Sequence, residues 1–199
     1  MFQTNTMRVA IIGLYNSGSS VLSQIMRELG FEIGNPLWGK HFESQSLQTH
    51  LSQWWSEPDL IECVKREQRV LFFTEWAEHH EANTSLVCAK HPLLCLSGFD
   101  LEEAWGPNYK VIRAARPLEE SIAGLTKRGW FDEPRRIQKT LHVASEKFFA
   151  VKSHFVSNYA DLLADPQKQI GDLLEFLEID RSGEQLIRAA NLVRQHKSK

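Results

Sequence analysis

The sequence predicts an α/β fold of the P-loop nucleotide-hydrolase-like kind, a three-layer fold with a mostly parallel sheet flanked by helices. Two observations lead to this prediction. Short apolar stretches alternate with stretches of helical period along the 199 residues. A turn rich in glycine and serine joins the first strand to the first helix. The length suits one domain, so we expect a single domain over residues 1–199 with a helical insertion at about 35–83.

The first strand and the first helix have the clearest patterns. Arg8–Leu14 is a short apolar stretch that ends in glycine and polar residues, which predicts a strand. Apolar residues then recur at helical spacing from Val21 to Leu29, and Gly30 is placed to end this helix. The predicted order is therefore strand, glycine loop, helix.

The elements after the first helix are expected to alternate. In the insertion, Leu47–Trp55 and Leu60–His80 have the pattern of helices, and Pro58 separates them. Strands that alternate with helices imply a mostly parallel sheet with helices on both faces. The later strands are expected at Ser85–Ala89, Tyr109–Ala115 and His154–Ser157, and the later helices at Leu118 to about Lys127, Ile137 to Phe148 and Ile170 to Leu177.

Composition and charge exclude several classes of function. A net charge of −2 argues against a protein that grips a nucleic-acid backbone. No apolar run is long enough to span a membrane, and the polar start of the chain is not typical of a signal peptide. The three cysteines form no C-x-x-C pair, which suits a reducing compartment, so a cytoplasmic protein is expected. The eight histidines show no ligand spacing, so no metal site is expected.

Positive charge is concentrated between Lys110 and Lys139, where there are eight basic and four acidic residues. Such an excess can focus a small polyanion. A solvated helix and loop would give the same count, and on charge alone this second interpretation is favoured.

The turn Gly13-Leu14-Tyr15-Asn16-Ser17-Gly18-Ser19-Ser20 has the spacing of a phosphate-binding P-loop. Glycines allow a tight turn whose N–H groups point at phosphate oxygens, and the helix N-terminus adds unpaired donors. Ser19 and Ser20 can cap the helix or donate to the phosphate. Ser19 stands where ATP and GTP hydrolases have lysine, which argues against hydrolysis of these nucleotides. A helix-capping turn in another α/β fold is the alternative.

Three segments, in order, resemble the bacterial sulfotransferases, and together they cover nearly the whole chain. The first, Val9–Gly34, resembles the family's strand, G-x-x-R/K-S-G-T-S/T loop and first helix. The second, Ala89–Pro92 with Tyr109–Leu125, resembles its K-x-P element and its strand–Arg–helix. The third, Phe155–Leu177, is similar to its late Y-E-D-L, D-P and F-L-G pattern. Gly39–Ser44 is a weaker match to a G-x-F/Y-E segment.

The resemblance implies a donor and a set of residues that bind it. The donor of this family is 3′-phosphoadenosine 5′-phosphosulfate (PAPS), which serves as co-substrate without a metal. Arg116 would pair with the 3′-phosphate, a task suited to a planar guanidinium. The family has Ser at the position of Gly124, and Ser121, one turn earlier, is a possible substitute. The loop residues that would hold the 5′-phosphosulfate are Tyr15, Asn16, Ser17, Gly18, Ser19 and Ser20.

The chain departs from the family pattern at four positions. Asn16 replaces Arg or Lys, Gly124 replaces Ser, Ala160 replaces Glu, and Glu178 replaces Gly. The first two touch donor binding directly. Either neighbouring cations such as Lys90 or Arg113 compensate, or the donor is bound more weakly.

Candidates for the chemistry follow from the needs of sulfuryl transfer, which are a base and one or two stabilising cations or hydroxyls. Lys90, at a strand end, is the predicted cation. Glu43 is the first candidate for the base and His41 the second. A histidine titrates near neutral pH, and burial can raise the pKa of a carboxylate far enough for it to take a proton. His79, His80 and His91 are further options for the base, and Trp130 is a candidate ligand contact.

The leading hypothesis is therefore a sulfotransferase that acts on a hydroxyl or amine of a small molecule or glycan. The acceptor pocket would be built from the segment 35–83 and the loop around Trp130. Two alternatives remain open at this point. One is a P-loop kinase of small molecules or nucleotides, and the other is a catalytically inactive nucleotide-binding protein of the same fold.

Overall fold

The computed structural model describes residues 6–56, 59–82 and 84–197. Within these residues the central sheet has four parallel strands in the order β6-β1-β7-β8. The strands are β1 Met7–Ile12, β6 Leu86–Lys90, β7 Lys110–Ala115 and β8 Phe155–Asn158. The predicted parallel sheet is confirmed, and each strand lies within two residues of its predicted bounds.

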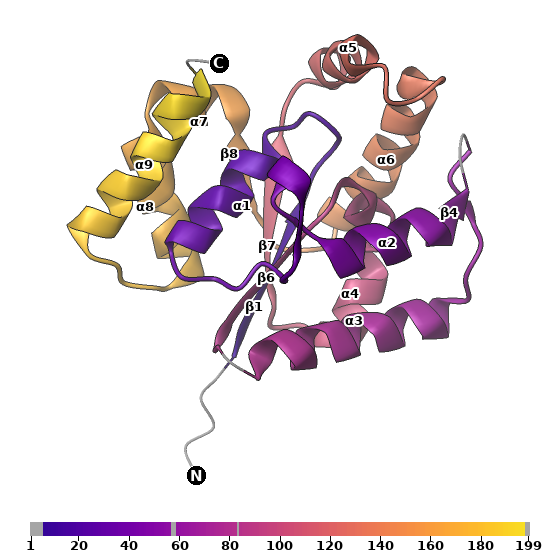
Figure 1. Ribbon diagram of the computed structural model, residues 1–199, viewed down its shortest axis with the longest axis horizontal. Helices are drawn as coiled ribbons and strands as arrows, with labels where there is room; N and C mark the ends of the chain where they lie inside the picture. Colours follow the sequence, from indigo (N-terminus) through magenta and orange to yellow (C-terminus); the bar gives the residue numbers. More distant parts are fainter. Residues whose placement is uncertain (1–5, 57–58, 83, 198–199) are drawn as a thin grey trace.

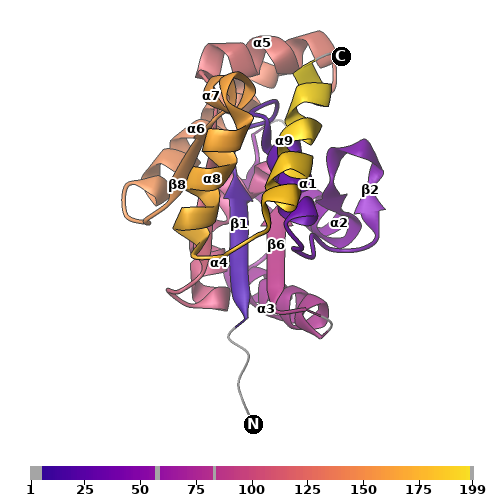
Figure 2. The same ribbon diagram turned by 90° about the vertical axis from the view of Figure 1, so that its left-hand side faces the viewer.

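Helices cover both faces of this sheet (Figures 1 and 2). Side chains of a strand point alternately to its two faces. Val9 and Ile11 of β1 accordingly lie in one buried core and Ala10 and Ile12 in the other. The first core is closed by α1 Ser19–Glu28, α8 Pro166–Leu177 and α9 Gly183–Lys197, and the second by α2 Gln45–Trp54, α3 Arg66–Glu81, α4 Gly98–Trp105 and α6 Pro134–Phe149.

Helices α5 Leu118–Arg128 and α7 Tyr159–Ala164 lie at the carboxyl edge of the sheet, at the top of Figure 1. Helix α5 follows β7, and α7 follows β8. The short helices η1 Gly39–His41 and η2 Pro92–Leu96 follow β2 Leu37–Trp38 and β6. None of the helices in the described ranges combines the length and the apolar character that a membrane crossing requires.

One predicted helix begins later than expected. The pattern predicts a helix over Leu60–His80, whereas α3 begins at Arg66. The residues before it pair with the end of α2, because β5 Ile61–Glu62 forms an antiparallel hairpin with β4 Trp55–Ser56. This pairing depends on contact with a separate segment, which helical periodicity does not register. Pro58, the predicted separator, lies outside the described residues.

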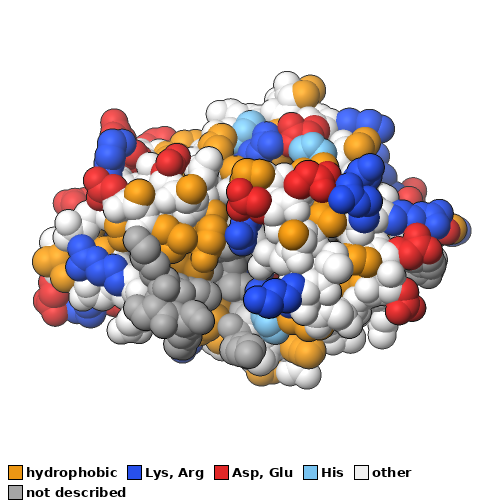
Figure 3. Space-filling model, turned by 90° about the horizontal axis from the view of Figure 1, so that it is seen from above, with side chains coloured by type: hydrophobic (Ala, Val, Ile, Leu, Met, Phe, Trp, Pro, Cys, Tyr) orange, Lys and Arg blue, Asp and Glu red, His pale blue; other side chains and the backbone are white. Residues whose placement is uncertain are grey.

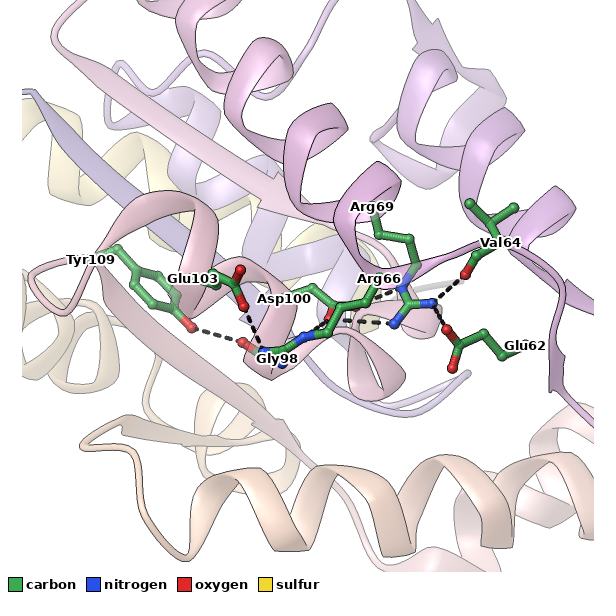
Figure 4. A network of polar contacts seen from close by, with 8 residues as sticks. All are labelled: Glu62, Val64, Arg66, Arg69, Gly98, Asp100, Glu103 and Tyr109. Carbon is green, nitrogen blue, oxygen red and sulfur yellow. Dashed lines mark hydrogen bonds and ion pairs between the residues drawn. The ribbon is translucent and has the colours of Figure 1, made fainter.

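A buried ion pair holds α3 against α4 (Figure 4). Arg69 Nε donates to Asp100 Oδ2 at 2.8 Å, and both side chains are only 5% exposed. Arg69 also donates to the carbonyl of Val64 at 2.7 Å and pairs with Glu62. The guanidinium therefore ties the hairpin, α3 and α4 together. These contacts tie β5 and α3 to α4.

Candidate functional site

The loop between β1 and α1 lines a cavity of about 100 Å³ at the carboxyl edge of the sheet. Ligands of open α/β sheets bind beyond this edge. From the loop and the first turn of α1 the cavity is lined by Tyr15, Asn16, Gly18, Ser19, Ser20 and Val21. The rest of its lining is His41, Glu43, Lys90, Pro92, Arg116, Arg128, Trp130 and Tyr159. Figure 3 looks onto this edge, where basic side chains reach the surface among hydrophobic and acidic ones.

The loop has two residues with positive φ just before α1. Gly18 precedes α1 with φ +91°, in the left-handed region that favours glycine, and Asn16 has φ +62°. The first N–H groups of a helix have no acceptor within it and carry the positive end of its dipole. No side chain caps α1 at Gly18, so capping by Ser19 or Ser20 is not observed. Ser17 is buried and is not part of the cavity lining.

Lys90 and Glu43, two of the three predicted catalytic residues, form a buried ion pair at this cavity. The Lys90 side chain is 2% exposed and that of Glu43 is 11% exposed. Lys90 Nζ also donates to Ser20 Oγ at 3.2 Å and to the carbonyl of His41 at 3.3 Å. One ammonium group therefore joins the end of β6, the loop between β1 and α1 and the segment after η1.

The pair shifts the titration of both groups. Burial lowers the pKa of the Lys90 ammonium, and Glu43 only partly opposes this. Burial by itself would raise the pKa of Glu43, but the neighbouring Lys90 ammonium does most to hold it below its ordinary value. Glu43 is therefore a carboxylate at neutral pH. It can accept a proton only if its contact with Lys90 weakens.

His91 is a buried neutral neighbour of this pair. Burial lowers its pKa from the ordinary 6.5 to about 4. Its Nδ1 accepts a hydrogen bond from the N–H of Leu93 at 3.1 Å, which caps η2. Its Nε2 lies 3.8 Å from Glu43 Oε2. His91 therefore lies beside Glu43 without lining the loop cavity.

Arg116 lies on the other side of the loop. Its Nη1 donates to the carbonyl of Asn16 at 3.1 Å, and its Nε donates to Glu120 at 3.1 Å. The guanidinium stacks on the ring of Tyr159 with a distance of 5.1 Å to the ring centroid. Tyr159 in turn contacts Gly18, where an added Cβ would overlap its ring. The loop and Arg116 thus lie side by side, as their predicted shared role requires.

The two departures that touch the loop, Asn16 and Gly124, are in contact with each other. A Cβ added at Gly124 would overlap the side-chain amide of Asn16. A serine at 124 would therefore collide with Asn16 in this conformation. Ser121, the suggested substitute, is fully buried and is not among the cavity residues. Gln138 Nε2 donates to the backbone carbonyl of Ser121 at 3.1 Å, on the side of α5 that faces α6.

Of the two cations that were predicted to compensate for Asn16, only Lys90 reaches the cavity. Arg113 pairs with Glu146 and stacks on Phe149 at 4.8 Å. It lines a different cavity, which also borders on Pro117. Both Glu146 and Phe149 belong to α6, so the Arg113 side chain lies on the face of the sheet that α6 covers and not in the loop cavity.

Arg128 and Tyr159 line the cavity, although the pattern analysis did not select them. Arg128 Nη2 donates to Asn16 Oδ1 at 3.2 Å, and its guanidinium lies 4.8 Å from the ring centroid of Trp130. The basic excess between Lys110 and Lys139 was a signal for Arg128. The contact of Tyr159 with both Gly18 and Arg116 is visible only in three dimensions.

A larger cavity of about 430 Å³ adjoins the first. The two share Tyr15, His41, Glu43 and Trp130. The second cavity is otherwise lined by Trp38, Gln48, Ser52, Trp55, Leu60, His91, Leu93 and Phe131. Most of these residues come from segment 35–83 and the loop around Trp130, where the acceptor pocket was expected. Glu43 and His41 lie at the junction of the two cavities.

The described residues contain no group of three or more His, Cys, Asp or Glu side chains that could hold a metal ion. Cys88 and Cys95 are buried thiols and Cys63 is an exposed one. Burial raises the pKa of both buried thiols, which makes them unreactive. The polar groups at the loop cavity include three cations, several hydroxyls, the Glu43 carboxylate, the His41 imidazole and the Asn16 amide.

No protein-family model matches the sequence, and no curated protein matches it. Solved structures do match. The sulfotransferase STF9 from Mycobacterium avium superposes with a TM-score of 0.60 at 12% identity over 96% of this chain and 69% of its own. The sulfotransferase domain of the Synechococcus PCC 7002 olefin synthase gives 0.55 at 17% identity over 95% and 79%.

A nucleoside kinase is also similar. The deoxyadenosine kinase from M. mycoides superposes with a TM-score of 0.50 at 18% identity, over 86% of this chain and 99% of its own. Sulfotransferases and this kinase share a parallel sheet flanked by helices. The chain therefore has a P-loop-like α/β fold of the kind found in sulfotransferases.

Proposed function

We propose that the protein transfers a sulfuryl group from PAPS to a hydroxyl or amine acceptor. The observation that carries the proposal is the convergence of three groups on one cavity: the phosphate loop, Lys90 and Arg116. The loop provides backbone donors for the 5′-phosphosulfate, and Arg116 provides a guanidinium for the 3′-phosphate. The sulfotransferase neighbours support the proposal through their fold.

In the proposed reaction the acceptor oxygen or nitrogen attacks the sulfur atom. The bond between sulfur and the 5′-phosphate oxygen breaks, and 3′,5′-adenosine bisphosphate leaves. The acceptor proton passes to the carboxylate of Glu43, with His41 as the second candidate. Lys90 stabilises the negative charge that grows on the leaving oxygen. As the charge grows, it competes with Glu43 for Lys90, which makes the carboxylate more basic when a base is needed.

The larger cavity is proposed as the acceptor pocket, because Glu43 and His41 lie where it meets the loop cavity. An acceptor bound there would place its hydroxyl or amine next to the proposed base. Trp130 would border both ligands. A small molecule fits this enclosure more readily than a long glycan, since cavities of about 300–1,000 Å³ are typical of small-molecule sites.

The kinase alternative has one supporting observation, the fold shared with the deoxyadenosine kinase. Against it, Ser19 occupies the position at which phosphoryl-transferring P-loops have lysine. An inactive nucleotide-binding protein would have the same cavity. The experiment therefore has to show both which nucleotide binds and whether a sulfuryl group is transferred.

The test is a thermal-shift titration with 3′,5′-adenosine bisphosphate, ATP with magnesium, and GTP with magnesium. A ligand at 100 times its Kd stabilises the folded state by about 2.7 kcal/mol. We expect stabilisation by the bisphosphate and not by the other two. Preference for ATP would favour the kinase, and binding without turnover of PAPS over a panel of alcohols, phenols and amines would favour the inactive protein.

Arg116→Ala and Arg113→Ala form a matched pair for this titration. Both residues are arginines near the end of β7, but only Arg116 lines the loop cavity. Loss of a charged hydrogen bond weakens binding by about 10- to 100-fold. Arg116→Ala should therefore lose most of the bisphosphate shift, while Arg113→Ala keeps it. Equal shifts in the two variants would refute the assignment of the 3′-phosphate.

A further inference from the structure

The positive charge of the loop cavity is unevenly compensated. Three basic side chains line the cavity: Lys90, Arg116 and Arg128. Lys90 is paired with Glu43, and Arg116 is paired with Glu120 at 3.1 Å. Within the described part of the chain, Arg128 has no carboxylate partner. Arg128 therefore has the cationic charge most available to an anionic ligand.

Arg128 is also held in position. Its guanidinium stacks on Trp130 at 4.8 Å and donates from Nη2 to Asn16 Oδ1 at 3.2 Å. Both partners are uncharged, so they orient the guanidinium without neutralising it. Stacking leaves its edge donors available. The Arg128 charge is felt inside the cavity, since it contributes to the lowered pKa of Lys90.

The position of Asn16 depends on Gly124. The amide of Asn16 occupies the space that a Cβ at 124 would fill. Arg128 lies one helical turn after Gly124 on α5, so one face of this helix provides both the space for Asn16 and the cation that Asn16 orients. Positions 16, 124 and 128 therefore form one structural unit across 112 residues of sequence.

We propose that Arg128 is the residue that binds the anionic group held by the phosphate loop, with Asn16 and Gly124 as its positioning residues. If the proposed function holds, that group is the 5′-phosphosulfate of the donor. The role of Arg128 is distinct from that of Arg116, which lies on the Tyr159 side of the loop. The contact itself requires only an anion, so inorganic pyrophosphate serves as a second probe.

The experiment compares Arg128→Gln with Lys127→Gln by calorimetric titration of pyrophosphate and of 3′,5′-adenosine bisphosphate. Lys127 is the matched control, because it is the preceding exposed cation on α5 and does not line the cavity. Arg128→Gln should weaken both ligands by about 10- to 100-fold, the loss expected for a charge-assisted hydrogen bond. Lys127→Gln should change them less than about twofold, and Arg128→Lys should recover part of the loss because it restores the charge.

Two half-ligands locate the contact. Adenosine 5′-phosphosulfate has the 5′-group only, and adenosine 3′-monophosphate has the 3′-group only. Arg128→Gln should weaken the first and spare the second, whereas Arg116→Ala should do the reverse. Affinity of Arg128→Gln within about twofold of wild type for pyrophosphate would overturn the proposal. So would a loss confined to the 3′-ligand.

Positioning by Asn16 and Gly124 is tested with Gly124→Ala and the double variant Asn16→Gly, Gly124→Ala. The single variant should lower both the melting temperature and pyrophosphate affinity, because the new methyl group displaces Asn16. The double variant should regain the melting temperature, since glycine suits φ +62° and removes the collision. It should not regain affinity. A single variant that matches wild type in both measurements would contradict the positioning role.

The outcomes separate this inference from the proposed function. Wild-type protein that binds pyrophosphate through Arg128, but neither binds the bisphosphate nor turns over PAPS, would refute the sulfotransferase and support Arg128 as an anion-binding residue. Binding of the bisphosphate with full affinity in Arg128→Gln would support the nucleotide site and overturn this inference. Wild-type protein that binds neither ligand would overturn both.

Discussion

Replacing Glu43 with glutamine would leave the Lys90 ammonium buried without its counter-ion. The Lys90 side chain is 2% exposed, and its other described partners are the hydroxyl of Ser20 and the carbonyl of His41. Removal of one partner from a buried ion pair destabilises a protein by about 3–5 kcal/mol. Because two polar partners remain, we expect the lower end, about 3 kcal/mol.

Urea denaturation at pH 7.5, followed by circular dichroism, measures this loss. In a protein of this size each kcal/mol corresponds to about 2–4 °C, so the melting temperature should fall by about 6–12 °C. The double variant Glu43→Gln, Lys90→Met removes both charges and should lie within about 1 kcal/mol of wild type. Pyrophosphate should stabilise Glu43→Gln more than wild type, because the anion takes the place of the carboxylate.

Two results would refute this reasoning. A loss below about 1 kcal/mol in Glu43→Gln would mean that Lys90 is solvated or neutral rather than half of a buried pair. A double variant whose loss equals the sum of the two single variants would mean that Lys90 and Glu43 act independently.

Three further predictions follow from other parts of the structure. The pKa of His91 is lowered to about 4, so between about pH 6.5 and pH 4 the unfolded chain binds more protons than the folded one. Stability should therefore fall by about 3 kcal/mol as the pH falls through this range. His91→Asn keeps an acceptor for the N–H of Leu93 and should flatten the pH dependence of the urea midpoint. An unchanged slope in this variant would be evidence against a neutral buried His91. Gly18→Ala should lower the melting temperature and the bisphosphate affinity more than Gly39→Ala does. Both glycines have positive φ, but only the methyl group added at Gly18 would overlap a ring, that of Tyr159. Equal losses would argue against close packing behind the loop. Arg69→Met should cost about 3 kcal/mol because it leaves the 5% exposed carboxylate of Asp100 without its main partner. Arg135→Met, which breaks an exposed pair with Glu119, should leave the urea midpoint and the melting temperature close to those of wild type. Similar losses in the two variants would contradict the role given to burial.

Local patterns were sufficient to predict the core of the fold. The apolar runs of β1, β6, β7 and β8 are short and bounded by turn residues, and strands buried on both faces have this character. The glycine-rich turn predicted between the first strand and the first helix lies between β1 and α1, because glycine and serine interrupt the apolar pattern there. The positions of Lys90 and Arg116 at strand ends then followed from the common direction of parallel strands.

Contacts between distant segments were beyond the reach of these patterns. Because β5 pairs with β4, α3 begins only at Arg66. Helix α4 has only eight residues, which is too few for a helical repeat of apolar residues to be recognised. The burial of Lys90 could not be predicted from the sequence either. A lysine at a strand end is usually solvated, and its charge can be buried here because Glu43 pairs with it. The contact of Arg128 with Asn16 joins residues 112 positions apart, and no local signal predicts it.

The central claim is that one nucleotide with two anionic ends spans the phosphate loop and Arg116. A crystal structure of the protein with 3′,5′-adenosine bisphosphate tests it most directly. The account predicts the 5′-phosphate within hydrogen-bonding distance of the loop N–H groups and of Arg128, and the 3′-phosphate on Arg116. A bisphosphate bound at another face, or bound without contact between its 3′-phosphate and Arg116, would contradict it.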